Sequence, residues 1–74
     1  MNLSETIKQL RKDKGLTQAE LAKRSGATQS KISMIEKGGG ARFATAVRIL
    51  EALGYKLVVT FKSQAEGGQN VTNN

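Results

Sequence analysis

The 74-residue chain contains no cysteine, no histidine and no proline, and only three aromatic residues. Without cysteine there is no disulfide framework and no thiolate metal site, and without histidine the commonest general base and metal ligand are missing. Enzymes built on either residue are excluded, and we expect no catalytic residue, cofactor or metal ion. The chain also lacks a signal-peptide pattern and any apolar run near the roughly 18 residues of a membrane span. The sequence therefore predicts a cytoplasmic protein that does not span a membrane.

Positive charge is what the chain has in excess. The chain has twelve Lys and Arg residues and six Asp and Glu residues, which gives a formal net charge of +6 and a pI near 10.1. Such a balance points to a polyanionic partner, either nucleic acid or an acidic membrane surface. The chain is long enough for one small domain but leaves no room for a deep substrate pocket. These bounds favour a binding protein over an enzyme.

Four segments separated by glycines carry apolar residues at the spacing of an α-helix. We expect helices over residues 3–14, 18–24, 29–37 and 43–53. Asn2, Thr17 and Thr28 are suitable N-caps, and Thr17 begins a capping box that Glu20 completes. Gly26 suits a left-handed turn between the second and third helices. The first helix has an apolar stripe of Leu3, Ile7 and Leu10, and the fourth is expected to bury Phe43, Ala46, Val47, Ile49, Leu50 and Leu53.

After Gly54 the apolar residues no longer follow the 3.6-residue spacing of a helix but recur at every second position. This alternation predicts a β-strand over residues 55–62. No second strand is evident, and unpaired backbone groups are a liability. We therefore expect antiparallel pairing with a second copy of the chain, in a homodimer. The predicted organisation is mainly α: a compact four-helix domain over 1–54, a dimerisation strand over 55–62 and a disordered tail over 63–74. The expected dimer interface comprises Tyr55, Leu57, Val58, Val59, Thr60 and Phe61.

The segment 18–37 has the organisation of a helix-turn-helix, two short helices joined by a glycine turn. Ala22 is small enough for a close helix crossing, and Ile32 and Ile35 can pin the second helix onto the first. The second helix then presents polar residues outward from its N-terminal end. A glutamine side chain can pair with adenine through two hydrogen bonds, and serine can bond bases or phosphates. This arrangement favours DNA binding, although each polar residue taken singly could belong to an ordinary solvated face.

At these positions the sequence resembles the Cro/repressor-type helix-turn-helix of the XRE family. The resemblance extends over residues 3–54 and is carried by Leu10-Arg11, the run from Gly15 to Ala22, Gly26, Gln29-Ser30, Ile32-Ser33, Ile35-Glu36 and Gly38. It implies a repressor-type fold in a dimeric regulator of double-stranded DNA with a palindromic operator. The helix over residues 29–37 would enter the major groove.

The resemblance also implies roles for individual residues. Gln18 would contact phosphate and brace Gln29, and Arg11 would pair with Glu36. Met34 departs from the polar residues often found at its position in the family, which leaves a thymine methyl group as its expected contact. The full set implied to contact DNA is Gln18, Thr28, Gln29, Ser30, Lys31, Ser33, Met34, Lys37 and Arg42.

Within the family, the strand after Gly54 is most similar to that of HipB-type antitoxins. This subclass would be a repressor that autoregulates a type II toxin–antitoxin operon, with a HipA-type kinase toxin as partner of the flexible tail. Two alternatives stay open: a stand-alone phage-type regulator, and an interaction module that binds a toxin through strand and tail. RNA binding is weakened by the scarcity of aromatics. The run Gly38–Gly40 is interpreted as a flexible connector, since no Gly-Lys-Ser/Thr motif follows it.

Overall fold

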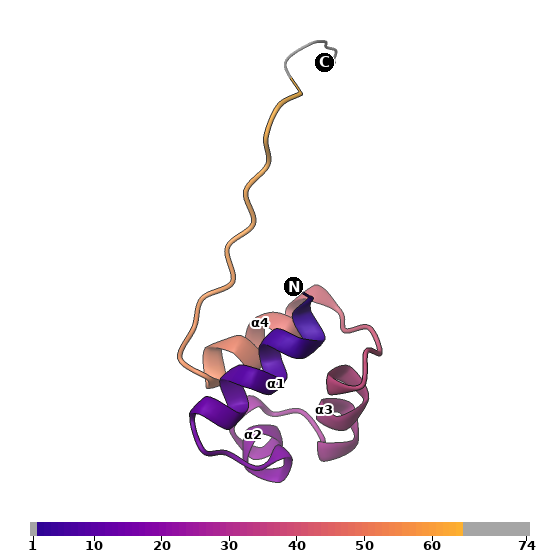
Figure 1. Ribbon diagram of the computed structural model, residues 1–74, viewed down its shortest axis with the longest axis vertical. Helices are drawn as coiled ribbons and strands as arrows, with labels where there is room; N and C mark the ends of the chain where they lie inside the picture. The colour runs from indigo at the N-terminus through magenta and orange to yellow at the C-terminus, as the bar shows by residue number, and fades with distance from the viewer. Residues whose placement is uncertain (1, 65–74) are drawn as a thin grey trace.

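Four α-helices make up the body of the molecule (Figure 1). The computed structural model describes residues 2–64 of the chain. Within these residues lie α1 (Leu3–Asp13), α2 (Gln18–Ser25), α3 (Gln29–Glu36) and α4 (Phe43–Ala52). The four predicted helices are confirmed, each with an end that differs by one residue. None of the described helices is both long and apolar enough to cross a membrane.

The first three helices begin at the predicted capping residues. The Asn2 side chain accepts a hydrogen bond from the Glu5 amide at 2.8 Å. The Thr17 hydroxyl accepts from the Glu20 amide at 3.0 Å, and the Glu20 carboxylate accepts from the Thr17 amide at 2.8 Å, which completes the capping box. Thr28 caps α3 in the same way, by accepting from the amide three residues on at 3.1 Å. Each cap satisfies an otherwise orphaned N–H and contributes about 1 kcal/mol.

The turn between α2 and α3 depends on Gly26 and on a buried serine. Gly26 has φ +79°, a left-handed conformation that costs a residue with a Cβ about 1–2 kcal/mol. Ser25, which is 7% exposed, extends α2 one residue beyond the prediction. Its hydroxyl donates to the Ala22 carbonyl and accepts from the Ala27 amide, both at 3.3 Å. The buried hydroxyl is thereby satisfied, and the turn directs the chain into α3 at a defined angle.

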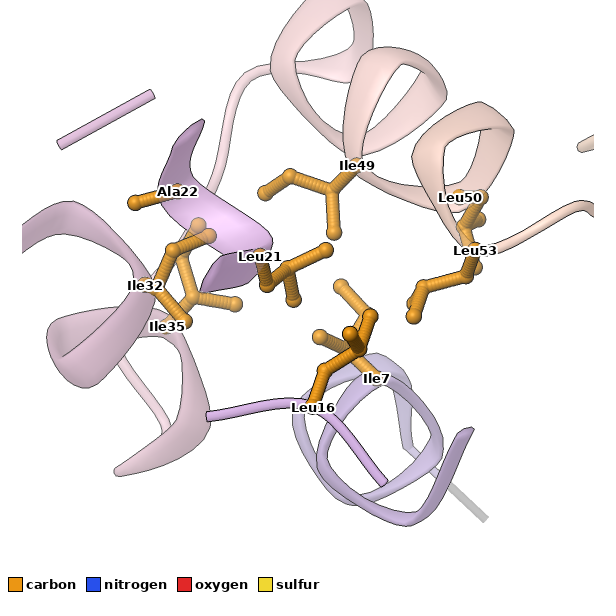
Figure 2. Packing of buried hydrophobic residues seen from close by; sticks show 9 residues of the cluster. All are labelled: Ile7, Leu16, Leu21, Ala22, Ile32, Ile35, Ile49, Leu50 and Leu53. Carbon is orange, nitrogen blue, oxygen red and sulfur yellow. The ribbon is translucent and has the colours of Figure 1, made fainter. Parts of the chain in front are cut away.

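The hydrophobic core draws side chains from all four helices (Figure 2). Helix α2 lies at its centre and packs against both α3 and α4, while α1 packs against α3. Three isoleucines from three different helices, Ile7, Ile32 and Ile49, are completely buried. The cluster as a whole consists of Ile7, Leu16, Leu21, Ala22, Ile32, Ile35, Ile49, Leu50 and Leu53.

Two residues of the predicted apolar stripes lie in solvent instead. Phe43 is 60% exposed and Leu3 is 38% exposed, so the prediction that Phe43 is buried was wrong. Each is the first residue of its helix, and side chains tilt toward the N-terminus of the helix that carries them. They therefore project past the last packed layer of the core. Val47, also predicted to be buried, is half-buried.

Beyond α4 the chain leaves the helices as an extended segment (Figure 1). Its start is fixed, because the Tyr55 amide donates to the Leu50 carbonyl at 2.8 Å and Leu57 packs against the core. Val59 and Phe61, further along the same segment, are 54% and 89% exposed. No strand pairing occurs within residues 2–64, and pairing with a second copy stays a prediction. Of the predicted tail, residues 65–74 lie outside the described residues.

Candidate nucleic-acid interface

Helix α3 has one face in the core and one in solvent. Ile32 and Ile35 are 0% and 1% exposed, and they hold the helix against the rest of the domain. Gln29, Ser30 and Lys37 are exposed. Within the described part of the chain, the side chains of these three residues make no hydrogen bond to another protein group. The outward face of α3 is therefore free to bond a ligand.

Six of the predicted DNA-contacting residues meet in one open hollow of about 630 Å³, which we call the recognition hollow. They are the first residue of α2, four residues of α3 and the C-cap of α3, and the loop after α3 adds a glycine. The hollow thus brings together side chains that lie up to about twenty residues apart in the sequence. Its lining consists of Gln18, Gln29, Ser30, Ser33, Met34, Lys37 and Gly39.

The other three predicted residues do not line the recognition hollow. Thr28 is the N-cap of α3, so its hydroxyl oxygen already accepts a hydrogen bond from the protein. Lys31 lies exposed on α3, and Arg42 is the exposed N-cap of α4, where it makes no side-chain cap bond.

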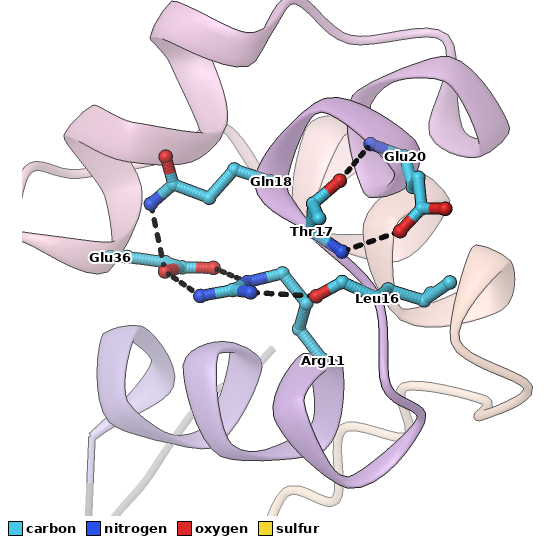
Figure 3. A network of polar contacts seen from close by, with 6 residues as sticks. All are labelled: Arg11, Leu16, Thr17, Gln18, Glu20 and Glu36. Carbon is cyan, nitrogen blue, oxygen red and sulfur yellow. Dashed lines mark hydrogen bonds and ion pairs between the residues drawn. The ribbon is translucent and has the colours of Figure 1, made fainter.

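Beside the hollow, an ion pair connects α1 to the C-terminal end of α3 (Figure 3). The Arg11 guanidinium donates to both carboxylate oxygens of Glu36, with Nε–Oε2 at 2.7 Å and Nη2–Oε1 at 3.0 Å. Its Nη1 donates to the Leu16 carbonyl at 2.7 Å. The two side chains are only 11% and 3% exposed. The predicted pair is therefore present as a two-pronged, largely buried interaction, which fixes orientation as well as distance.

Gln18 has a different partner from the expected one. Its Nε2 donates to Glu36 Oε1 at 3.1 Å (Figure 3), and it makes no hydrogen bond to Gln29 within the described residues. The structure thus has Gln18 bracing Glu36, and a contact of Gln18 with Gln29 stays a prediction. A carboxylate is a stronger acceptor than a neutral amide, so the Gln18 amide group turns toward Glu36. Glu36 thus ties three helices together, since Arg11 belongs to α1 and Gln18 to α2.

This environment determines the ionisation of the pair. Burial raises the pKa of the Glu36 carboxyl, but hydrogen bonds from Arg11 and Gln18 and the positive charges of Arg11 and Lys8 lower it by more. The pKa of Glu36 consequently lies below its usual 4.5. The hydrogen bond to Glu36 in turn raises the pKa of Arg11. Both groups are held in their charged forms.

Gly39 is the one residue of the hollow that sequence reasoning missed. The Gly38 amide donates to the Ile35 carbonyl at 3.0 Å, and the Gly39 amide donates to the Met34 carbonyl at 2.9 Å. The first two residues of the run Gly38–Gly40, interpreted as a flexible connector, therefore form a hydrogen-bonded turn at the end of α3. Nothing in a run of three glycines indicates which one lines the hollow. Only the path of the turn shows it.

The fold and the hollow together define a helix-turn-helix DNA-binding domain. Residues 7–59 match the family model described as "Helix-turn-helix" (HTH_3), which covers more than two thirds of the chain. The chain therefore belongs to this helix-turn-helix family, of the XRE type, and is a DNA-binding transcription regulator. A search of the curated proteins found no match.

The ion pair predicts how stability depends on pH. Since Glu36 has a lowered pKa in the folded state, its contribution is fully present above the unfolded value near 4.5 and is lost as the pH falls through the folded value. We expect the Glu36→Gln variant to be less stable than the wild type, with a difference that shrinks steadily below pH 4.5. Urea denaturation at a series of pH values measures it.

A second variant controls for the loss of one negative charge. Glu51→Gln makes the same change at an exposed position of α4. A stability difference between wild type and Glu36→Gln that stays constant with pH would contradict a carboxylate held by Arg11 and Gln18.

Proposed function

We propose that this protein is a sequence-specific transcriptional repressor that places α3 in the major groove of its operator. The observation that carries the proposal is the recognition hollow, where six side chains of the expected kind converge on the exposed face of α3. Their position relative to the rest of the domain is fixed by Ile32 and Ile35 below and by the Arg11–Glu36 pair at the end of the helix. A rigid platform with free polar groups is what base recognition requires.

Each part of the surface has a chemical task in this proposal. Gln29 is the first residue of α3, and its unengaged amide group can donate to and accept from one adenine. Ser30 and Ser33 supply shorter donors and acceptors along the same groove. The free amides at the start of α3 attract a phosphate. The exposed cations, with Lys37 nearest the hollow, neutralise further phosphates, in keeping with the net charge of +6.

Two substitutions separate base recognition from phosphate attraction. Gln29→Ala should cost about 1–3 kcal/mol per half-site and relax the preference at one base position, because a two-bond pairing is lost. Lys37→Ala should weaken binding to all sequences alike and make the salt dependence less steep by about one unit per half-site. Operators are obtained by selection from random duplex DNA, and fluorescence anisotropy then measures a panel of single mismatches at several salt concentrations.

The two variants serve as controls for each other, since both replace an exposed side chain of the same hollow. A uniform loss of affinity in both would show that Gln29 does not recognise a base. Selection that yields no preferred sequence would contradict the repressor itself.

We propose further that the regulator acts as a homodimer. The support is the extended segment after α4, in which Val58, Val59 and Phe61 are 68%, 54% and 89% exposed. An isolated extended segment with free backbone groups and apolar side chains can satisfy both by pairing with its own copy about a two-fold axis. A dimer of this kind would set two α3 helices about 34–36 Å apart, the distance between half-sites of a palindrome one DNA turn long.

Val59→Asp should prevent this pairing, because it places a charge on the apolar side of the paired segments. We expect the wild type to sediment as a dimer at micromolar concentration and the variant as a monomer with weakened operator binding. Ser63→Asp introduces the same charge just beyond the predicted strand and should leave both properties unchanged. A wild-type protein that is monomeric in sedimentation equilibrium would refute the dimer.

A second proposal concerns the biological setting: the regulator is the antitoxin of a type II pair, with a HipA-type kinase toxin as its partner. The support is the resemblance to HipB-type antitoxins and the chain that continues past the helices as an extended segment. A stand-alone phage-type regulator and a module that binds a toxin without DNA are the alternatives.

The product of the neighbouring gene tests this setting. We expect its expression to arrest growth, and co-expression of the full chain to relieve the arrest. A chain that ends after Lys62 should keep its operator affinity but lose the rescue. A neighbouring product without toxicity would refute the antitoxin role and leave the stand-alone regulator, while rescue by a chain without operator affinity would indicate the interaction module.

A further inference from the structure

We propose that Met34, positioned by Gly39, recognises the 5-methyl group of a pyrimidine in the major groove. The group is displayed by thymine and by 5-methylcytosine at the same place on the base. This inference rests on the proposed function, because it takes α3 to lie in the groove. It adds two details to that function. Met34 selects a methyl group, and Gly39 provides the space that this selection requires.

Met34 is the apolar member of an otherwise polar hollow. Its side chain lies among two glutamines, two serines and a lysine, and the residue is 45% exposed. The thioether sulfur is only a weak hydrogen-bond acceptor, so the main contribution of Met34 to binding comes from burial against an apolar group. In the major groove, the apolar group that base edges present is the methyl group at C5 of a pyrimidine. A flexible methionine can adapt its end to that group.

Gly39 provides the space in which Met34 lies. A Cβ atom on Gly39 would be 2.7 Å from Met34 Cγ and 2.9 Å from the Met34 carbonyl oxygen. Both separations are far shorter than a van der Waals contact, and the second involves backbone that cannot move aside cheaply. The Met34 side chain therefore packs directly on the backbone of the turn, which is itself held by the 2.9 Å bond from the Gly39 amide to the Met34 carbonyl. Gly39 is thus a positioning residue for Met34.

The experiment removes the methyl group without changing base pairing. In the operator selected from random DNA, each thymine is replaced in turn by deoxyuridine, and anisotropy measures the affinity of the full-length protein. We expect one thymine in each half-site at which the wild type binds about fourfold more weakly after replacement, the effect of one methyl group no longer buried. Met34→Ala should bind both duplexes equally, and Met34→Leu should retain part of the discrimination.

A second arm distinguishes the two sources of the group. At the same position a cytosine–guanine pair is tested with and without the 5-methyl group. Methylation should strengthen wild-type binding about fourfold and leave Met34→Ala unaffected. The tighter of the thymine and 5-methylcytosine duplexes then identifies the base for which the site is built.

Gly39→Ala tests the positioning role, and Gly40→Ala is its matched control, since a Cβ at Gly40 meets nothing within 4 Å. Gly39→Ala should lose the discrimination between thymine and deoxyuridine, whereas Gly40→Ala should keep it. Circular dichroism establishes that both variants are folded. If Gly39→Ala does not fold, the Met34 variants alone test the recognition of the methyl group. The failure to fold then supports the close packing of Met34 on Gly39.

Several results would overturn the inference. They are a selected half-site without an invariant thymine, a half-site in which no replacement by deoxyuridine matters, and a deoxyuridine effect that persists in Met34→Ala. Retained discrimination in folded Gly39→Ala would remove the positioning role. All of these occur with sequence-specific binding intact. An absence of any sequence preference would instead refute the proposed function.

Discussion

The buried contact between Arg11 and Glu36 is the interaction on which the geometry of this domain depends. It connects α1 to the end of α3, and through Gln18 it also includes α2. A buried ion pair adds little net stability compared with apolar packing, but breaking one leaves an uncompensated charge and costs about 3–5 kcal/mol. Its main effect is to define orientation, because the guanidinium and the carboxylate meet through two parallel hydrogen bonds.

Stability and orientation therefore have different sources. The core is made of aliphatic side chains, in which α2 lies between α3 and α4. Such packing is strong but not directional, and alone it would tolerate a small rotation of α3. The ion pair at the C-terminal end of α3 restricts that rotation, because Arg11 belongs to α1. The consequence is that the outer face of α3 is presented at a fixed angle.

Much of this fold could be predicted from the sequence because its signals are local. Capping residues and a left-handed glycine depend only on neighbours in the chain, and Thr17, Thr28 and Gly26 behave as expected. The predicted burial of Phe43 was wrong because the apolar stripe of a helix does not reveal where the core ends. The Glu36 partner of Gln18 and the contact of Gly39 with Met34 depend on how separate segments meet in space, which spacing does not encode. The pairing of the extended segment depends on a second chain, which no property of a single chain determines.

The outer side chains Gln29, Ser30 and Lys37 form no hydrogen bond to other protein groups among the described residues. Under the proposed function, folding and DNA binding thus depend on different residues of α3 and its C-cap. Because exchanging Gln29 or Ser30 would remove no internal side-chain contact, gene duplication followed by drift at these two positions would, under the proposed function, produce regulators with new operators at almost constant stability. Gln18 and Met34 are less free to vary, since the former bonds Glu36 and the latter packs on Gly39. Divergence of specificity within such a lineage should begin at the start of α3 and reach its last turn only later.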